Sequence, residues 1–364
     1  MSIEVLGDKM FFREAFWIGA LPLSTALVAT AVPAQPVFQP PAQMAAAQSA
    51  LATRVTFNAL AMAGDRMVVA GQRGHVLTSE DGATWRQAHV PVSSDLTALS
   101  FASPREGWAV GHEGVILHSS DGGESWTRQL DGKQAAALIL RRYGTPAHAN
   151  DPTAQRLKKE AEAFAAQGAD KPFLDVWFED DKKGFAIGAF NLILRTEDGG
   201  KTWTPWLDRI DNPKGLHLYA MRPAGGQLFI VGEQGLVLKL DQQRQRFVNV
   251  PIPYQGTLFG VVGTQTATVV FGLRGNAWRS TDGGFSWRRI DTGVNAGLAS
   301  GLVRPDGAIV LVSQAGEVLL STDDGATFGR VNVANAAPAF AVAQRDKGTL
   351  ALAGVGGVRL QEVK

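Results

Sequence analysis

Short apolar runs separated by turn residues recur along most of the chain. Residues 96–101, 108–111, 115–119 and 126–130 form one such unit, and each run has the length and composition of a β-strand. Aligning the chain on itself gives seven units, which begin near residues 67, 107, 184, 228, 268, 308 and 349. The pattern therefore predicts a repeated group of antiparallel strands.

The first residue of a G-x-x-G turn, or of its degenerate equivalent, measures the period. It falls at Gly71, Gly111, Gly188, Gly232, Gly272, Ser313 and Gly354, and every interval but one lies between 40 and 44 residues. This period suits a four-stranded blade, and a ring of blades leaves no long exposed sheet edge. We predict an all-β fold, a single seven-bladed β-propeller of four-stranded blades over residues 51–364. The last unit ends before its fourth strand, so we expect a segment within residues 45–55 to supply that strand and close the ring.

A second motif, Ser/Thr-x-Asp-x-Gly-x-Ser/Thr-Trp/Phe, follows the third strand of most units. A short carboxylate can accept backbone N–H bonds across a tight turn, and the aromatic ring can be buried between blades. A catalytic carboxylate would occur once or as a pair, whereas this one recurs, so we interpret these Asp-box positions as structural. In the first unit Glu replaces Asp. The carboxylates are Glu80, Asp121, Asp198, Asp282 and Asp323, and the aromatic residues are Trp85, Trp126, Trp203, Trp287 and Phe328.

The one long interval contains an insertion, residues 131–172, between the second and third blades. Asp151 can cap a helix that begins at Pro152, with Leu157, Ala161 and Phe164 on one face. Residues 132–144 predict a second helix with a basic rim. We therefore expect a helical insertion between blades 2 and 3.

Composition and the N-terminus indicate the setting. The net charge of +1 gives no global field for nucleic acid, and the absence of cysteine excludes disulfides, thiol catalysis and an N-terminal lipoprotein anchor. Residues 15–32 are uncharged and largely apolar, which is typical of a signal peptide over residues 1–34, with Met10 as an alternative start. Residues 35–50, rich in Gln, Pro and Ala, would form a tether. We expect a periplasmic protein, tethered to the membrane if the signal is not cleaved.

The Asp-box units resemble the bacterial-neuraminidase-repeat propellers, and among these the photosystem II stability/assembly factor family, over the whole propeller. That resemblance implies a non-enzymatic scaffold which binds a membrane protein complex, or an exporter component in a non-photosynthetic bacterium. The alternative is a glycan-acting hydrolase or a lectin-like module. A sialidase would need an Arg-Ile-Pro element and a Tyr-Glu pair, and the sequence has neither in a recognisable context. Glu179-Asp180-Asp181 fits a solvated turn better than a catalytic pair.

The six histidines show no metal-ligand spacing, so we expect no metal and no cofactor. Strand parity places the insertion and the G-x-x-G turns on one face, opposite the Asp boxes. Non-repeating side chains on a repeated turn are where a propeller varies its specificity, although such residues are often merely solvated. We expect a monomer that binds its partner through this face. The candidate partner-binding residues are Arg73, His112, Glu113, Phe190, Glu233 and Arg274 in the turns, and Arg141, Arg142, Lys158 and Lys159 on the insertion.

Overall fold

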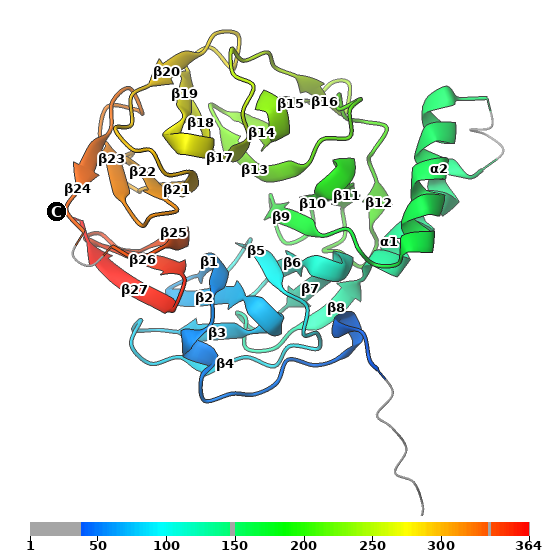
Figure 1. Cartoon of the computed structure of the whole chain (residues 1–364), viewed down its shortest axis with the longest axis horizontal. Helices are drawn as coiled ribbons and strands as arrows, with labels where there is room; N and C mark the ends of the chain where they lie inside the picture. Colours follow the sequence, from blue (N-terminus) through cyan, green and yellow to red (C-terminus); the bar gives the residue numbers. More distant parts are fainter. Residues whose placement is uncertain (1–37, 146–149, 334–335, 364) are drawn as a thin grey trace, which may run out of the picture. The chain divides into compact units, whose positions relative to one another are not determined.

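Each sequence unit folds into one antiparallel sheet, and the sheets succeed one another around a centre (Figure 1). The computed structural model describes residues 38–145, 150–333 and 336–363, and residues 39–364 form one compact unit. The predicted signal segment, its cleavage site and the alternative start at Met10 lie outside the described residues. Within these residues, no helix combines the length and apolar character that a membrane crossing requires.

The seven blades follow chain order, and each runs from an inner to an outer strand. Blades 1 to 3 contain β1 Phe57–Ala63, β2 Arg66–Gly71, β3 Val76–Ser79, β4 Arg86–Gln87; β5 Leu96–Phe101, β6 Gly107–Gly111, β7 Ile116–Ser119, β8 Thr127–Leu130; β9 Phe173–Phe178, β10 Gly184–Gly188, β11 Ile193–Thr196 and β12 Thr204–Pro205. Blades 4 to 7 contain β13 Leu218–Ala224, β14 Gln227–Gly232, β15 Val237–Asp241, β16 Arg246–Asn249; β17 Leu258–Gly263, β18 Thr268–Gly272, β19 Ala277–Ser280, β20 Arg288–Ile290; β21 Leu298–Val303, β22 Ile309–Ser313, β23 Val318–Ser321, β24 Gly329–Val331; β25 Ala339–Asp346, β26 Thr349–Gly354 and β27 Gly357–Glu362.

The second strand is the most buried strand in blades 2 to 7, because it packs against the neighbouring blades on both faces. All five residues of β6, β10, β18 and β22 are buried, which explains their nearly continuous apolar sequence. The predicted seven-bladed propeller is confirmed.

Blade 7 differs from the prediction, since its sheet has three strands in the described residues. The expected closing segment contains a short 3₁₀ turn, η2 (Ala52–Arg54), in place of a strand. Closure comes instead from apolar packing between blades 1 and 7, where Phe57, Val69 and Leu77 meet Ala341 and Ala353. Figure 1 shows the red blade 7 next to the blue blade 1.

The expected tether, residues 35–50, lies partly against blade 1. Ala42 and Ala46 are buried, and the backbone N–H of Ala46 donates to the carbonyl of Val90 at 3.0 Å. The side chain of Gln48 donates to the carbonyl of Ala88. Residues from Gln39 onward therefore belong to the propeller unit.

The insertion is helical, as predicted, and forms a hairpin of α1 (Gly132–Tyr143) and α2 (Pro152–Gln167). Asp131 caps α1 by accepting from the N–H of Gln134, whose side chain in turn accepts from the N–H of Asp131. Asp151 caps α2, and Pro152 occupies its first position. Ile139, Leu157 and Phe164 are buried in the same core as blades 2 and 3, so the hairpin packs on its own propeller.

Candidate functional site

The two faces of the propeller are chemically unlike. In an antiparallel blade, the connection between strands 2 and 3 lies at the end opposite to the other two connections. We call the face with the strand 2–3 turns the turn face, and the face with the strand 3–4 turns the box face. The turn face also carries the hairpin, because a Cβ on Gly114, in the turn of blade 2, would meet Gly132 at 2.7 Å and Lys171 at 3.3 Å.

On the box face, one hydrogen-bonded turn recurs in blades 2, 3, 5 and 6. In blade 2, Asp121 accepts from the backbone N–H of Ser125 at 3.0 Å and from its hydroxyl at 2.5 Å, while Ser119 donates to the same carboxylate. Hydrogen bonds from Ser286 lower the pKa of Asp282 to about 2. These bonds hold each carboxylate on its own turn, where it shapes the backbone.

The aromatic residues after these turns pack between blades. Trp126 and Trp203 are buried, and each lies edge-on to a phenylalanine ring at 6.1 Å, Phe101 and Phe178 respectively. Trp85, Trp287 and Phe328 are partly buried. Each phenylalanine belongs to the same blade as its tryptophan. Trp126 also shares a buried core with Val68 and Val90 next to it in the ring, so its large apolar surface lies where blades 1 and 2 meet.

The position assigned to Glu80 is a correction to the sequence alignment. The pairing Met67–Ser79 matches the pairing Gly107–Ser119 in blade 2, so that Ser79 begins the turn in blade 1. Asp81 is the carboxylate that accepts from Ser79 and from the N–H of Thr84. The turn of blade 1 is one residue shorter than the others, and Glu80 points outward to an ion pair with Arg66 at 2.7 Å.

The turn-face residues share one unusual backbone conformation. Arg73, Glu113, Phe190, Gln234 and Arg274 all have φ between 53° and 55°, in the left-handed region. This region costs an L-residue roughly 1–2 kcal/mol, and bulky side chains rarely adopt it. The repeated turn therefore fixes the backbone and leaves the side chain free to vary. His112 and Glu233 stand one position earlier in their turns.

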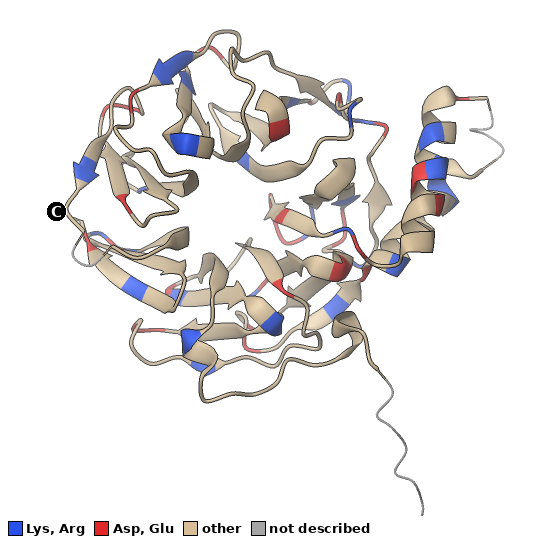
Figure 2. Ribbon diagram, in the orientation of Figure 1, with Lys and Arg blue, Asp and Glu red and all other residues tan. Residues whose placement is uncertain are grey.

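The four cations predicted on the hairpin have different surroundings. Arg141 and Lys159 are exposed on its surface. Lys158 pairs with Glu162 at 3.8 Å along α2. Arg142 is different, because it lies 3.5 Å from Asp208 on the propeller and contributes to docking of the hairpin. Figure 2 shows that α2 carries both positive and negative residues.

The inner strands carry a feature that the sequence did not reveal. Each of the seven has a register shift near its start, for example between Phe57 and Ala59, where one residue is left out of the pairing. Such a bulge re-aims a side chain. The seven bulge residues all line a central cavity of about 450 Å³, and we call them the bulge ring: Asn58, Thr97, Leu174, Tyr219, Phe259, Ala299 and Phe340.

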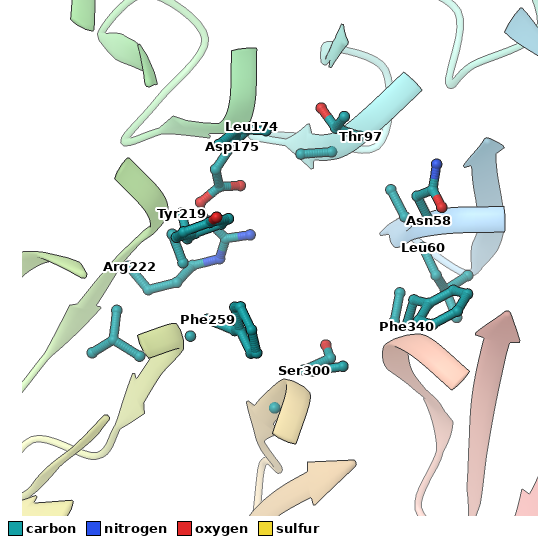
Figure 3. Close-up of a pocket in the computed structure, with 18 of the residues that line it drawn as sticks. Asn58, Leu60, Thr97, Leu174, Asp175, Tyr219, Arg222, Phe259, Ser300 and Phe340 are labelled. Carbon is teal, nitrogen blue, oxygen red and sulfur yellow. Dashed lines mark hydrogen bonds and ion pairs between the residues drawn. The ribbon is translucent and has the colours of Figure 1, made fainter. Parts of the chain in front are cut away.

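The bulge ring lies at the turn-face end of this cavity. The residue before each bulge pairs with the residue that begins the strand 2–3 turn, as Leu218 pairs with Gly232. The ring is unequal, with aromatic side chains from blades 4, 5 and 7 and polar ones from blades 1 and 2. Figure 3 shows Tyr219 and Phe259 on one side of the cavity and Asn58 on the other.

An ion pair lies deeper in the same cavity. The carboxylate of Asp175, only 4% exposed, accepts from Arg222 at 2.5 Å and from the N–H of Met221 at 2.7 Å. Figure 3 shows this carboxylate turned toward Arg222. The sequence feature that could have revealed this ion pair is the position of Asp175 within the otherwise apolar run 173–178.

The predicted acidic cluster forms an exposed turn, in which Asp180 accepts from the backbone N–H groups of Lys182 and Lys183. The tyrosines Tyr143, Tyr219 and Tyr254 lie in the hairpin, in the bulge ring and beside Trp278. Among the described residues, no three His, Asp or Glu side chains gather as a metal site.

The repeats and the seven blades define a propeller of the bacterial-neuraminidase-repeat type. The chain belongs to the family described as photosynthesis system II assembly factor YCF48, whose model matches residues 48–139 and 158–335. The match omits residues 140–157, which include the end of α1 and the start of α2.

Curated relatives include cyanobacterial proteins. The photosystem II assembly lipoprotein Ycf48 of Synechococcus sp. (strain CC9902) is 27% identical over 44% of this chain and 49% of its own length. The photosystem II assembly protein Ycf48 of Synechococcus sp. (strain JA-2-3B'a(2-13)) is 26% identical over 55% of this chain and 60% of its own length. The chain thus spans about half to three-fifths of these relatives.

Solved structures share the fold. One described as YCF48 bound to D1 peptide has a TM-score of 0.62 and 17% identity, and covers 86% of this chain and 94% of its own. A streptogramin B lyase has the same TM-score with 12% identity over 85% of this chain and 95% of its own. At these identities the likeness concerns the fold alone.

Proposed function

We propose that this protein is a non-enzymatic assembly factor that binds an extramembrane segment of a membrane protein complex through its turn face. The observation that carries the proposal is the family match over residues 48–139 and 158–335. The relatives are named as photosystem II assembly proteins, and one solved family member is described with a D1 peptide bound.

The chemistry of the two faces supports this location. The box face repeats one turn whose carboxylates are tied up by their own serine or threonine, as Asp121 is by Ser125. The turn face carries different side chains on one backbone geometry, together with the bulge ring and the hairpin. Variable side chains on a rigid frame suit recognition of a partner.

The hairpin gives the site its individual character in this proposal. Residues 140–157 fall outside the family match, and Arg141 is among them. Arg141 and Lys159 are both exposed, although Lys159 lies within the match. The protein that this assembly factor binds is a photosystem II component or an exporter component, and binding takes place on the periplasmic or lumenal side of the membrane. The apolar run at residues 15–32 supports export.

Crosslinking in membranes with mild detergent extraction, followed by mass spectrometry, tests the proposal. We expect wild type to capture one membrane protein complex and the double variant R141E/K159E to lose it at an unchanged unfolding temperature. The matched control is R86E/R244E, whose arginines are 67% and 74% exposed away from the turn face. Equal capture by both double variants would remove the hairpin from the site. Hydrolysis of a glycan, abolished by one carboxylate substitution, would replace the assembly role with the enzymatic alternative.

A further inference from the structure

Four rings form a continuous arc from the outer turn face to the mouth of the central cavity. The ring of Phe190, in the turn of blade 3, lies 4.5 Å from that of His217. His217 lies 6.3 Å from Tyr219, and Tyr219 lies edge-on to Phe259 at 5.5 Å. The last two belong to the bulge ring, so the arc joins the turn beside the hairpin to the cavity.

Phe190 stands out in this arc. It is 55% exposed and has φ of 54°, a conformation that is costly for an aromatic residue. The equivalent turns carry Arg73, Glu113, Gln234 and Arg274, whose long polar side chains are readily solvated. Among these five turns, only the turn of blade 3 combines a left-handed backbone with an exposed aromatic ring. This combination indicates that the ring of Phe190 contacts a binding partner.

The polar and charged groups along the arc already have partners. His217 lies 3.3 Å from Glu233, and Arg222 pairs with Asp175. Lys171 lies 4.6 Å from the ring centre of Phe164 and 5.6 Å from that of Phe190, and burial lowers its pKa. A ligand charge would have to compete with these contacts. The ring of Phe190 is exposed, and the other three rings are partly exposed.

We propose that this arc binds an extended peptide segment through aromatic side chains at alternate positions. This inference deepens the assembly role and rests on it for the source of the peptide. Alternate side chains of an extended strand lie about 6.6 Å apart. This is close to the 6.3 Å between His217 and Tyr219, and the other two ring pairs are closer together, at 4.5 Å and 5.5 Å. Offset and edge-on contacts between rings hold such side chains in place. The mouth of the cavity, with Tyr219 and Phe259 on one side, receives one end of the segment.

Fluorescence anisotropy with the full chain tests the inference. The probe is a fluorescein-labelled, amidated peptide Gly-Trp-Ser-Trp-Ser-Trp-Ser-Gly, compared with versions that carry Leu or Ser in place of Trp. We expect F190A and Y219A each to weaken binding of the Trp peptide about tenfold. Y219F keeps the ring and should bind like wild type.

The matched control is F285A. Phe285 is 88% exposed in the strand 3–4 turn of blade 5, on the box face, and also lies near a lysine, with 5.2 Å between its ring centre and Lys239. Binding should be unchanged in this variant. The inference is overturned if the Trp peptide does not bind, if the Leu peptide binds equally well, or if F190A and Y219A behave like F285A.

The same variants separate this inference from the assembly role. Capture of a membrane complex that persists undiminished in F190A/Y219A would overturn the arc as its binding site and leave the assembly role intact. No capture by wild type, beside ring-dependent binding of the Trp peptide, would overturn the assembly role and leave the arc as a peptide site. Unfolding temperatures of all variants establish that each one is folded.

Discussion

The hydroxyl of Tyr143, at the end of α1, donates a hydrogen bond of 2.5 Å to the carboxylate of Asp208 on the propeller. The backbone N–H of Asp208 donates back to the same hydroxyl at 3.3 Å. Burial, together with the neighbouring carboxylate, raises the pKa of Tyr143, so the phenol keeps its proton at neutral pH. This contact fixes the hairpin to the blade beside it.

Replacing Tyr143 with Phe should therefore loosen the hairpin while the ring of blades persists. Loss of a buried hydrogen bond to a charged group costs about 1–3 kcal/mol. We expect faster proteolytic cleavage between α1 and α2 and a lower unfolding temperature. As a control, R156A removes only an exposed ion pair with Glu160 within α2 and should change little. Equal cleavage rates in both variants would contradict this account of docking.

Substitutions in blade 1 test the corrected turn. Asp81→Asn removes the carboxylate that organises the turn, whereas Glu80→Gln removes one exposed partner of Arg66. We expect the first to lower the unfolding temperature clearly and the second to change it little. The opposite order, measured by circular dichroism, would restore Glu80 as the turn residue.

The carboxylates of the Asp-box turns also predict that the protein becomes less stable at acidic pH. The pKa of Asp323 falls to about 2 through hydrogen bonds from Thr327, below the value of about 3.9 for an unfolded Asp. A lowered folded pKa adds stability above the unfolded pKa, and this is lost as pH falls through the folded value. Stability should thus decline between about pH 4 and pH 2. Urea unfolding of D323N across this range should show a shallower decline than wild type.

Removal of residues 1–50 should destabilise blade 1. It deletes the buried Ala42 and Ala46 and the hydrogen bonds to the carbonyls of Ala88 and Val90. Each such bond is worth roughly 1 kcal/mol. We expect a lower unfolding temperature with the propeller still folded. Identical melting of the truncated and full chains would show that this packing adds nothing.

The repeat could be predicted because its period and turns are written in local sequence. The helices of the insertion could also be predicted, since Asp131 and Asp151 signal their caps. The bulge ring could not be predicted, because a bulge depends on how two strands pair and the sequence of one short apolar strand does not specify it. Tyr219 and Phe259 read as ordinary strand residues for this reason.

The turn of blade 1 and the last strand of blade 7 depart from the repeat for related reasons. A gapless alignment assigns Glu80 to the turn of blade 1, although that turn is one residue shorter than the others. Symmetry predicts a fourth strand for blade 7, but Phe57 and Ala341 already pack together and close the ring without it. In both places, local packing replaces a feature that the repeat would have supplied.

The left-handed turns have a practical consequence for engineering. Positions 73, 113, 190, 234 and 274 hold side chains as different as arginine and phenylalanine on nearly one backbone geometry. A library randomised at these positions would alter the chemistry of one surface while the strands beneath it stay in register. The protein thus offers a circular display scaffold, on which new binding specificities can be selected without redesign of its core.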